Sequence, residues 1–283
     1  MSAALEPEAD ALPESLAGSS VTAARVQALA HLLPSVDLRT LDAGAALLTR
    51  IDRKYVVPIA TFEQLLDGLD GQWRALDIDG RRLFGYTSTY FDTLDLATYR
   101  AHLQGRRRRF KVRVRHYVDS GECLLEVKRK GLRGVTVKER TAHQAWRQFE
   151  LGPDGHAFVA DVLRGHATFP DTELAPVVTT SNRRATLAHL GSRSRLTVDV
   201  DLRCGWGGRA ALLRDGFVVL ESKVGGHASE VDRLLRGLGE RPVTISKYCL
   251  GVASLGLDVP HNPWRRSLRR YFESPTSEEL PCP

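Results

Sequence analysis

Apolar and polar residues alternate along much of the chain from about residue 47 onward, and this period of two predicts β-strands. Turn signals such as Asp119-Ser120-Gly121 separate several of the runs, as expected for strands joined by short connections. The predicted strands are 47–57, 73–79, 83–91, 108–118, 122–130, 135–141, 176–187, 194–203 and 216–224. The pattern therefore indicates a fold of the α+β class that is mainly β, with antiparallel strands.

Apolar residues recur with helical spacing in segments that lie before and between the strands. Residues 21–33 place Val26 and Leu29 on one face, and Pro34 follows, which predicts a short amphipathic helix. The other predicted helices are 61–69, 142–149, 155–164, 229–237 and 246–255. In the last of these Ser246 is the predicted N-cap, because a serine hydroxyl can accept a hydrogen bond from the first turn.

Several predicted strands carry charged side chains on one face and apolar side chains on the other. In one strand the cations Lys111, Arg113 and Arg115 share a face, because successive side chains of a strand point to opposite sides. The next strand repeats this arrangement with Glu126 and Lys128. The same pattern recurs in the pairs Lys138 and Arg140, Arg193 and Arg195, Asp199 and Asp201, and Glu221 and Lys223.

The charged faces have two explanations. A single antiparallel strand can simply turn its charged face to water. Recurrence of the pattern over at least five strands instead favours a closed antiparallel β-barrel, with a charged lumen and an apolar exterior that helices flank. Because a lumen crowded with Arg and Lys is unfavourable when empty, we expect it to hold a polyanion. Both residue types suit phosphate, Arg as a planar bidentate donor and Lys as a compact charge.

The distribution of charge along the chain also points to a polyanionic partner. The net charge is only +6, but the stretch from Gly105 to Arg140 contains thirteen Lys or Arg residues and four acidic residues. Such a concentration attracts nucleic acid, an anionic membrane or a phosphorylated small molecule. The cationic strands have only Phe110 and Tyr117 as aromatic neighbours, so they lack the stacking surface of most nucleic-acid binders. Nucleic acid is therefore the disfavoured partner.

Cysteine usage and hydropathy predict a cytoplasmic protein. The four cysteines form no CxxC pair, and none lies at zinc-ligand spacing from a histidine. The N-terminus lacks the features of a signal peptide, and no apolar stretch approaches the roughly 18 residues of a transmembrane helix.

Composition predicts three segments along the chain. They are a disordered acidic leader (1–20), one domain (21–258) with its core at 47–256, and a basic C-terminal tail (259–283). The tail is predicted to form one helix, and it is a candidate contact for a membrane surface or a protein partner. Its charge comes from Arg265, Arg266, Arg269 and Arg270.

A few carboxylates lie among the cations of the predicted lumen. Glu221, two residues before Lys223, is the predicted metal ligand, because a hard divalent cation that bridges phosphate oxygens needs carboxylate oxygen. A simple ion pair with Lys223 is the alternative. Asp199 and Asp201 are weaker metal candidates, and Glu126 equally suits an ion pair.

Nine short motifs occur in order between about residue 47 and residue 256. They are Asp52-Arg53-Lys54-Tyr55, Ser88-Thr89-Tyr90-Phe91-Asp92-Thr93, Lys111-Val112-Arg113-Val114-Arg115-His116-Tyr117, Glu126-Val127-Lys128, Val137-Lys138-Glu139-Arg140, Asn182-Arg183-Arg184-Ala185, Arg195 ahead of Asp199, Leu220-Glu221-Ser222-Lys223 and Ser246-Lys247-Tyr248. Together they resemble the VTC domain of the vacuolar transporter chaperone complex, a polyphosphate polymerase domain within the CYTH-like superfamily of triphosphate tunnel metalloenzymes.

The resemblance implies a metal-dependent phosphotransferase that moves the γ-phosphoryl group of ATP onto a polyphosphate chain and releases ADP, with Mn²⁺ or Mg²⁺ as cofactor. By position in the motifs, Glu221 is the implied metal ligand. The implied catalytic residues are Lys54, Arg113, Arg115, Lys128, Arg183, Arg195 and Lys247, and the implied phosphate-binding residues are Lys111, Lys138, Arg140 and Lys223. A triphosphatase or polyphosphatase on the same barrel, and a non-catalytic binder of polyphosphate or nucleic acid, are the alternatives.

One departure from the wider superfamily bears on this choice. The superfamily pattern Glu-x-Glu-x-Lys is replaced here by Arg50-Ile51-Asp52-Arg53-Lys54, so that an acidic metal position has become Arg. This replacement is typical of the polymerase branch and argues against the hydrolase and cyclase branches. The regulatory domain and membrane spans of the eukaryotic enzymes do not match this sequence.

Overall fold

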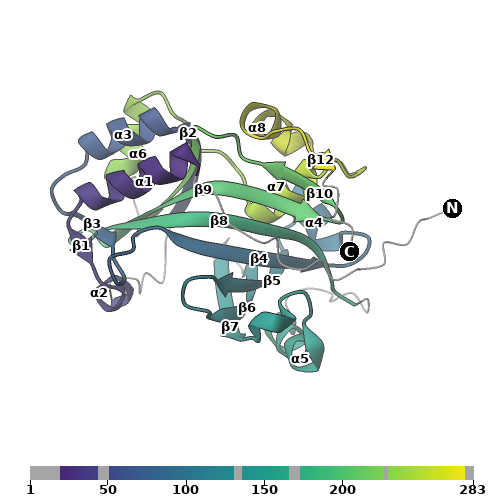
Figure 1. Cartoon of the computed structure of the whole chain (residues 1–283). Coiled ribbons are helices and arrows are strands. Elements are labelled where there is room, and N and C mark those ends of the chain that lie inside the picture. Colours follow the sequence, from purple (N-terminus) through teal and green to yellow (C-terminus); the bar gives the residue numbers. More distant parts are fainter. Residues whose placement is uncertain (1–19, 44–50, 131–135, 166–172, 226–228, 278–283) are drawn as a thin grey trace, which may run out of the picture.

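The computed structural model describes residues 20–43, 51–130, 136–165, 173–225 and 229–277 (Figure 1). The predicted acidic leader, apart from residue 20, lies outside these described residues. The main strands run in the order β2-β11-β9-β8-β4-β5-β6-β7, and every neighbouring pair is antiparallel. Their bounds are β2 (Ile51–Pro58), β4 (Phe84–Asp92), β5 (Phe110–Tyr117), β6 (Cys123–Lys130), β7 (Thr136–Ala142), β8 (Ala175–His189), β9 (Ser194–Trp206) and β11 (Phe217–Val224).

Four short strands extend this sheet at its edges. β3 (Trp73–Leu76) pairs with β8, and β1 (Ser35–Val36) pairs in parallel with β3. β10 (Arg209–Leu212) pairs with β9, and β12 (Thr276–Ser277) pairs with β10. All of the predicted strands are present, with ends that shift by a few residues. The strands that sequence reasoning missed, β1, β10 and β12, are too short for a period of two to reveal them.

Helices cover the apolar face of the sheet, as predicted. They are α1 (Val21–Leu32), α2 (Leu38–Ala43), α3 (Ile59–Asp67), α4 (Ala97–Leu103), α5 (Gly152–Leu163), α6 (Glu230–Gly237), α7 (Lys247–Ser254) and α8 (Arg265–Tyr271). Figure 1 shows α1, α3 and α6 grouped together, and they share a core with β2, β9 and β11 that includes Val57, Val198 and Leu220. α5 covers β5 and β6 through Val112 and Val114. Burial of each such side chain contributes about 1.5–3 kcal/mol to the free energy of folding.

The opposite face of the sheet is concave and charged. The Glu221 carboxylate on β11 acts electrostatically on Lys128 of β6, although five strand steps separate them in the sheet. A flat sheet would hold two such strands about 24 Å apart, since neighbouring strands lie about 4.8 Å apart. The sheet therefore curls so that its two arms face each other.

Apolar clusters close both ends of this concave face. At one end α7 packs on β8 and β9, where Val178, Cys204 and Leu250 belong to one buried cluster. At the other end Leu41 of α2 packs with Phe84. The charged residues described below lie between these two clusters.

The sheet does not close into the barrel that the sequence predicted. β2 and β7 end the strand order, and within the described ranges they do not pair with each other. A closing ladder would require these strands to lie about 4.8 Å apart. Long side chains instead meet between the arms: Lys111 of β5 interacts electrostatically with Lys54 of β2 and with Cys249 of α7. The space that these cations occupy keeps the edges apart, and the result is an open, curled sheet.

The segment 142–149 is not the predicted α-helix. β7 continues to Ala142, and the helical part is a single 3₁₀ turn at Ala145–Arg147. Only a few residues remain before Gly152 and Pro153 start α5, too few for an α-helix with its own core contacts. α2 and α4 were not predicted, because each spans fewer than two full turns and gives a weak periodic signal.

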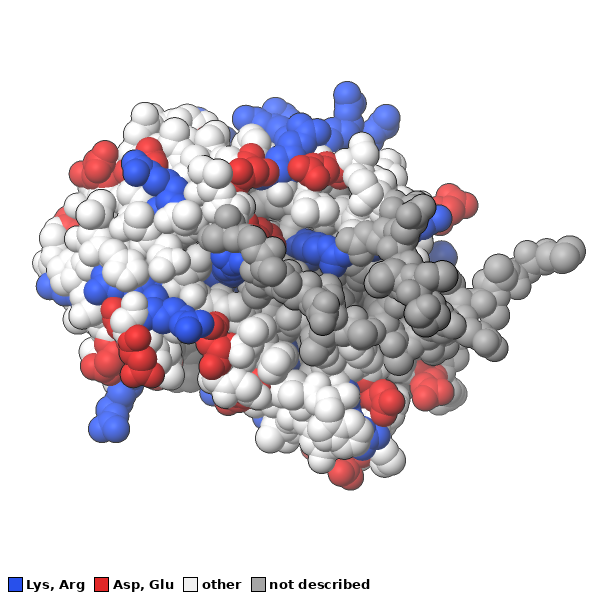
Figure 2. Space-filling view, viewed as in Figure 1, with Lys and Arg blue, Asp and Glu red and all other residues white. Residues whose placement is uncertain are grey.

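The basic C-terminal segment packs on the domain. Trp264 and Tyr271 are buried in the same cluster as α7, so they anchor both ends of α8. The arginines of α8 point to solvent, and Figure 2 shows Lys and Arg side chains gathered over this helix. No helix in the described part of the chain is both long enough and apolar enough to cross a membrane.

The contact between α7 and β8 depends on a glycine. A Cβ added to Gly251 would lie 2.9 Å from Cγ2 of Val178, which is fully buried and β-branched. We expect Gly251→Ala to lower the free energy of unfolding by about 1–3 kcal/mol through overpacking. Gly237→Ala is the matched control, because a Cβ on this last residue of α6 meets nothing within 4 Å. Denaturant midpoints measure both changes, and equal midpoints would contradict close packing of α7 on β8.

Candidate functional site

A buried ion network on β5, β6 and β7 forms one wall of the concave face. The Glu126 side chain is fully buried, and it pairs with Arg113, whose Nε donates to Oε2 at 2.6 Å, and with Lys138. Burial opposes the ionised form, but the charges of Arg113, Arg115 and Lys138 outweigh it and hold the pKa of Glu126 well below its usual range. The carboxylate thus stays ionised and fixes the direction of the Arg113 guanidinium.

Arg115 and Arg184 lie on either side of an aromatic ring at the centre of the face. Each guanidinium is 5.4 Å from the ring centroid of Tyr86, and Arg115 also donates to the Ser88 hydroxyl at 3.2 Å. Cation–π contact and hydrogen bonding leave part of each guanidinium fork available to a ligand. Burial lowers the pKa of Arg115.

Asp199 on β9 organises a second group of cations. Its carboxylate accepts from Arg184 at 2.5 and 2.8 Å and from the Asn182 amide at 3.1 Å, and the Nζ atom of Lys247 lies 2.7 Å away. Lys247 begins α7, and Ser246 caps this helix through a hydrogen bond from the Cys249 N–H, as predicted. Burial lowers the pKa of Lys247 to about 8.

Glu221 on β11 is the third carboxylate of the face that contacts two cations. Its oxygens lie 3.0 Å from Nζ of Lys223 and 3.9 Å from Nζ of Lys54, which faces Glu221 across the β2–β11 ladder. Burial opposes ionisation, yet the charges of Lys223, Lys54 and Arg184 hold the pKa of Glu221 well below its usual range. Lys54 also donates to the carbonyl oxygen of Ile245 at 3.3 Å, which ties β2 to the segment before α7.

Lys111 and Lys128 differ from these paired cations. Among the described residues, neither ammonium group forms an ion pair or a hydrogen bond, although both side chains are half-buried. Burial lowers the pKa of Lys111 to about 8, and burial together with the nearby charge of Arg113 lowers the pKa of Lys128 well below its usual value. A bound anion would relieve both penalties, because it would favour the charged forms.

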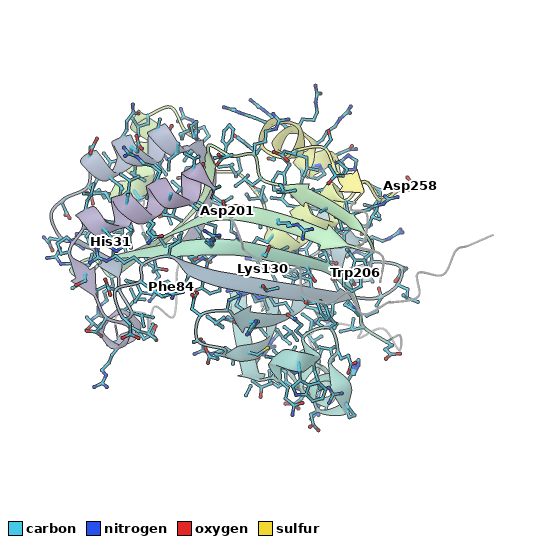
Figure 3. The ribbon with its side chains drawn as sticks, in the orientation of Figure 1. His31, Phe84, Lys130, Asp201, Trp206 and Asp258 are labelled. Atoms are coloured by element: carbon cyan, nitrogen blue, oxygen red, sulfur yellow. The ribbon has the colours of Figure 1, made fainter. Side chains whose placement is uncertain are left out.

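The remaining predicted residues lie outside this arrangement. Arg183 points to the opposite face, where it pairs with Asp201 at 3.7 Å, and Figure 3 places Asp201 on β9 beside α1. Arg195 lies at the α2 end of the face and donates to the Leu41 carbonyl at 3.0 Å. Arg140 shares a face with Glu126 but is exposed.

Arg184 is the residue of this site that sequence reasoning missed. The register between β8 and β9 shifts between Ser181 and Arg183, so a β-bulge decides which of the two adjacent arginines faces inward. Opposite this shift, Asp201 adopts a left-handed backbone with φ of 52°, a conformation in which Asp is enriched among residues other than glycine. A period of two cannot resolve such a shift.

Two places in the described structure offer carboxylate or imidazole ligands for a metal ion. Glu221 supplies hard carboxylate oxygens on the concave face, next to Lys223 and Lys54, which suits a divalent ion that takes its remaining ligands from phosphate. Elsewhere, ligand atoms of Asp70, His189 and Glu230 lie within 4.8 Å of one another. There His189 Nδ1 accepts from the Ser192 N–H at 3.0 Å, so the proton sits on Nε2, 3.0 Å from Asp70. In this second group, both ring nitrogens of His189 are therefore engaged in hydrogen bonds, and neither is available to bind a metal.

Comparison with known proteins gives the class and the family of the chain. The fold and the site define a curled antiparallel sheet with a cationic concave face. The family model for the VTC domain matches residues 49–256, and the chain belongs to this family. No curated protein sequence matches the chain.

Solved structures with a similar fold include three from distant sources. A putative adenylyl cyclase from Hippeastrum, described as having a dominant triphosphatase activity, is 17% identical over 74% of this chain and 98% of its own, with a TM-score of 0.46. The PH1819 protein of Pyrococcus horikoshii OT3 is 11% identical over 72% and 95%, with a TM-score of 0.42. A putative adenylate cyclase from Vibrio parahaemolyticus is 13% identical over 67% and 86%, with a TM-score of 0.36. Because these scores lie below 0.5, the family assignment rests on the sequence match.

The pKa values of the lysines predict how anion binding responds to pH. Lys111, Lys138 and Lys247 have pKa values lowered by burial to about 8, so they lose their charge as pH rises through that value. We expect the affinity for inorganic tripolyphosphate to fall about tenfold or more between about pH 7 and pH 9. Because the bound anion raises these pKa values, binding near pH 8 should take up protons. Calorimetry in buffers of different ionisation enthalpy measures both effects, and a flat profile would contradict the assignment.

Proposed function

We propose that this protein is a polyphosphate polymerase-type phosphotransferase, which transfers the γ-phosphoryl group of ATP to the end of a polyphosphate chain. The observation that carries the proposal is the pair of half-buried lysines, Lys111 and Lys128, whose ammonium groups have no ion-pair or hydrogen-bond partner among the described residues, on a concave face that already contains paired cations. A multiply charged, extended phosphate chain can contact both lysines and the free edges of Arg115 and Arg184 at once. Membership of the VTC domain family supports the same activity.

The chemistry that this proposal requires is mainly charge neutralisation. A terminal oxygen of the acceptor chain attacks the γ-phosphorus as the bond to the β–γ bridging oxygen breaks, and ADP leaves. Negative charge spreads over the transferred group, so preorganised Lys and Arg donors stabilise the transition state without a covalent intermediate. A divalent cation, Mn²⁺ or Mg²⁺, would be held by Glu221 and would neutralise phosphate oxygens. Lys247 and Arg184, both oriented by Asp199, are suited to grip a phosphate at the α7 end.

The carboxylates of the face favour a phosphate acceptor over water. Hydrolysis benefits from a general base whose pKa lies near the working pH. Glu126, Asp199 and Glu221 each contact two cations that hold their pKa values well below the usual range, so they are poor bases. A terminal phosphate of a chain is already ionised and needs no base. This distinction supports transfer over the alternative triphosphatase activity.

A product assay tests the proposal directly. The purified protein is incubated with ATP and Mn²⁺, and the products are separated by gel electrophoresis and assayed for phosphate release. Long phosphate chains with stoichiometric ADP would support the polymerase. Free phosphate without chains would identify a triphosphatase, and neither product, together with tight polyphosphate binding, would identify a non-catalytic binder.

Removal of an unneutralised lysine should separate activity from stability. We expect Lys128→Met to lower turnover about a hundredfold, because it removes one preorganised donor to the transferring phosphate. The same change should leave the melting temperature unchanged or raise it, because burial already disfavours the charged lysine. Arg108→Met is the matched control, because it removes one exposed positive charge from the segment before β5. Equal turnover in the two variants would exclude Lys128 from the site.

The role of Glu221 can be tested through the metal dependence. Glu221→Gln keeps the shape of the side chain and loses its charge, so we expect the Mn²⁺ concentration for half-maximal turnover to rise about tenfold or more. Glu139→Gln is the control, because Glu139 pairs with Arg129 at 2.8 Å on the opposite face of the neighbouring arm. Superimposable manganese titrations of wild type and Glu221→Gln would show that Glu221 is only an ion-pair partner of the lysines.

A further inference from the structure

Asp92 is a buried carboxylate that the candidate site does not use. It ends β4, its side chain is fully buried, and its oxygens accept hydrogen bonds from the backbone N–H groups of Thr93 at 2.8 Å and of Thr98 and Tyr99 at 2.9 Å. The hydroxyl of Tyr248 on α7 donates to the same carboxylate. A buried carboxylate with this many donors is satisfied and rigid, and it joins the start of α4 to α7.

Tyr248 connects this carboxylate to the cations of the site. It directly follows Lys247 in the first turn of α7, and it is almost completely buried. Its ring centroid lies 5.3 Å from that of Tyr90, and the Tyr90 hydroxyl accepts a hydrogen bond from Arg113 at 3.2 Å. The residue that Asp92 holds is therefore adjacent to Lys247 in the backbone and reaches the Arg113 guanidinium through Tyr90.

The position of the Lys247 ammonium group depends on the first turn of α7. A lysine side chain has four rotatable bonds, so a group held 2.7 Å from Asp199 requires a fixed starting point in the backbone. Ser246 fixes one side of this turn by capping the helix, and the hydrogen bond from Tyr248 to Asp92 fixes the other. Loss of either contact lets the turn shift, and a shift of 1 Å is enough to impair phosphoryl transfer.

We propose that Asp92 and Tyr248 are positioning residues that set the Lys247 ammonium group against the phosphate chain. This inference rests on the proposed function for its effect on turnover. Its physical content, the placement of Lys247, can be measured separately. The alternative is that the Asp92 and Tyr248 contact only stabilises the packing of α4 on α7.

The test compares two buried tyrosines of the same cluster. Tyr248→Phe removes the hydroxyl that contacts Asp92 and keeps the ring. Tyr99→Phe is the matched control, because it also removes a bonded tyrosine hydroxyl from the same cluster, but this hydroxyl contacts the carbonyl oxygen of Pro260 at 2.9 Å and not the Asp92 carboxylate. We expect turnover with ATP and Mn²⁺ to fall about five- to tenfold in Tyr248→Phe and to change less than about twofold in Tyr99→Phe. Equal losses in the two variants would mean a structural role only.

A double-mutant cycle makes the test specific to Lys247. If Tyr248 acts through Lys247, then Tyr248→Phe causes no further loss of turnover in a Lys247→Met background. Additive losses would overturn the proposal. Thr98→Val is the milder second variant should Tyr248→Phe not fold, because Thr98 Oγ1 donates to the same hydroxyl at 3.4 Å. It should give a smaller loss that also disappears without Lys247.

A chemical readout separates this inference from the proposed function. The acylation rate of Lys247 by an amine-reactive reagent is measured by peptide mass spectrometry in wild type, Tyr248→Phe and Tyr99→Phe. We expect faster labelling of Lys247 in Tyr248→Phe alone, because the ammonium group leaves Asp199. Unchanged labelling would refute the positioning role. If the wild-type protein has no polymerase activity but Lys247 is labelled faster in Tyr248→Phe, only the proposed function is refuted.

Discussion

The structure depends on the cost of gathering like charges on one side of a sheet. Three carboxylates of the concave face, Glu126, Asp199 and Glu221, each contact two cations, so these acids neutralise only part of the charge around them. The apolar cores beneath the helices supply the stability that this repulsion removes. The remaining positive charge is available for a ligand that carries several negative charges at short spacing.

This arrangement links the electrostatics of the site to its chemistry. Cations that are paired with carboxylates have fixed directions, whereas Lys111 and Lys128 are held half-buried with lowered pKa values. Under the proposed function, the cations paired with carboxylates supply geometry and Lys111 and Lys128 supply binding energy, since the two lysines gain an anionic partner when the phosphate chain binds. The same pairing lowers the basicity of the acids, which under the proposed function favours transfer of phosphoryl groups between phosphates over activation of water.

Much of this fold follows from the sequence because the sheet has two chemically distinct faces. Alternation of Val112 and Val114 with Arg113 predicted the strand and the direction of its side chains, and the structure confirms both. Closure failed as a prediction because periodicity reports on faces and carries no information on how far a sheet curls. The prediction that Arg183 faces the site, where the structure places Arg184, failed for a related reason. A single β-bulge reverses which side chains point inward beyond it.

The hydrogen bond from Lys54 to Ile245 joins residues 191 positions apart in the sequence. β2, near the start of the domain, thus forms one side of the concave face, and α7, near the end of the domain, closes one end of it. Such long-range pairing is slow to form, because the chain must close a large loop before the contact rewards it. Until α7 has been synthesised, the cations of the first strands, such as Lys54 on β2, therefore remain exposed to solvent. A polyanion that binds these gathered cations would stabilise the folded chain, because it binds the folded state in preference to the unfolded one.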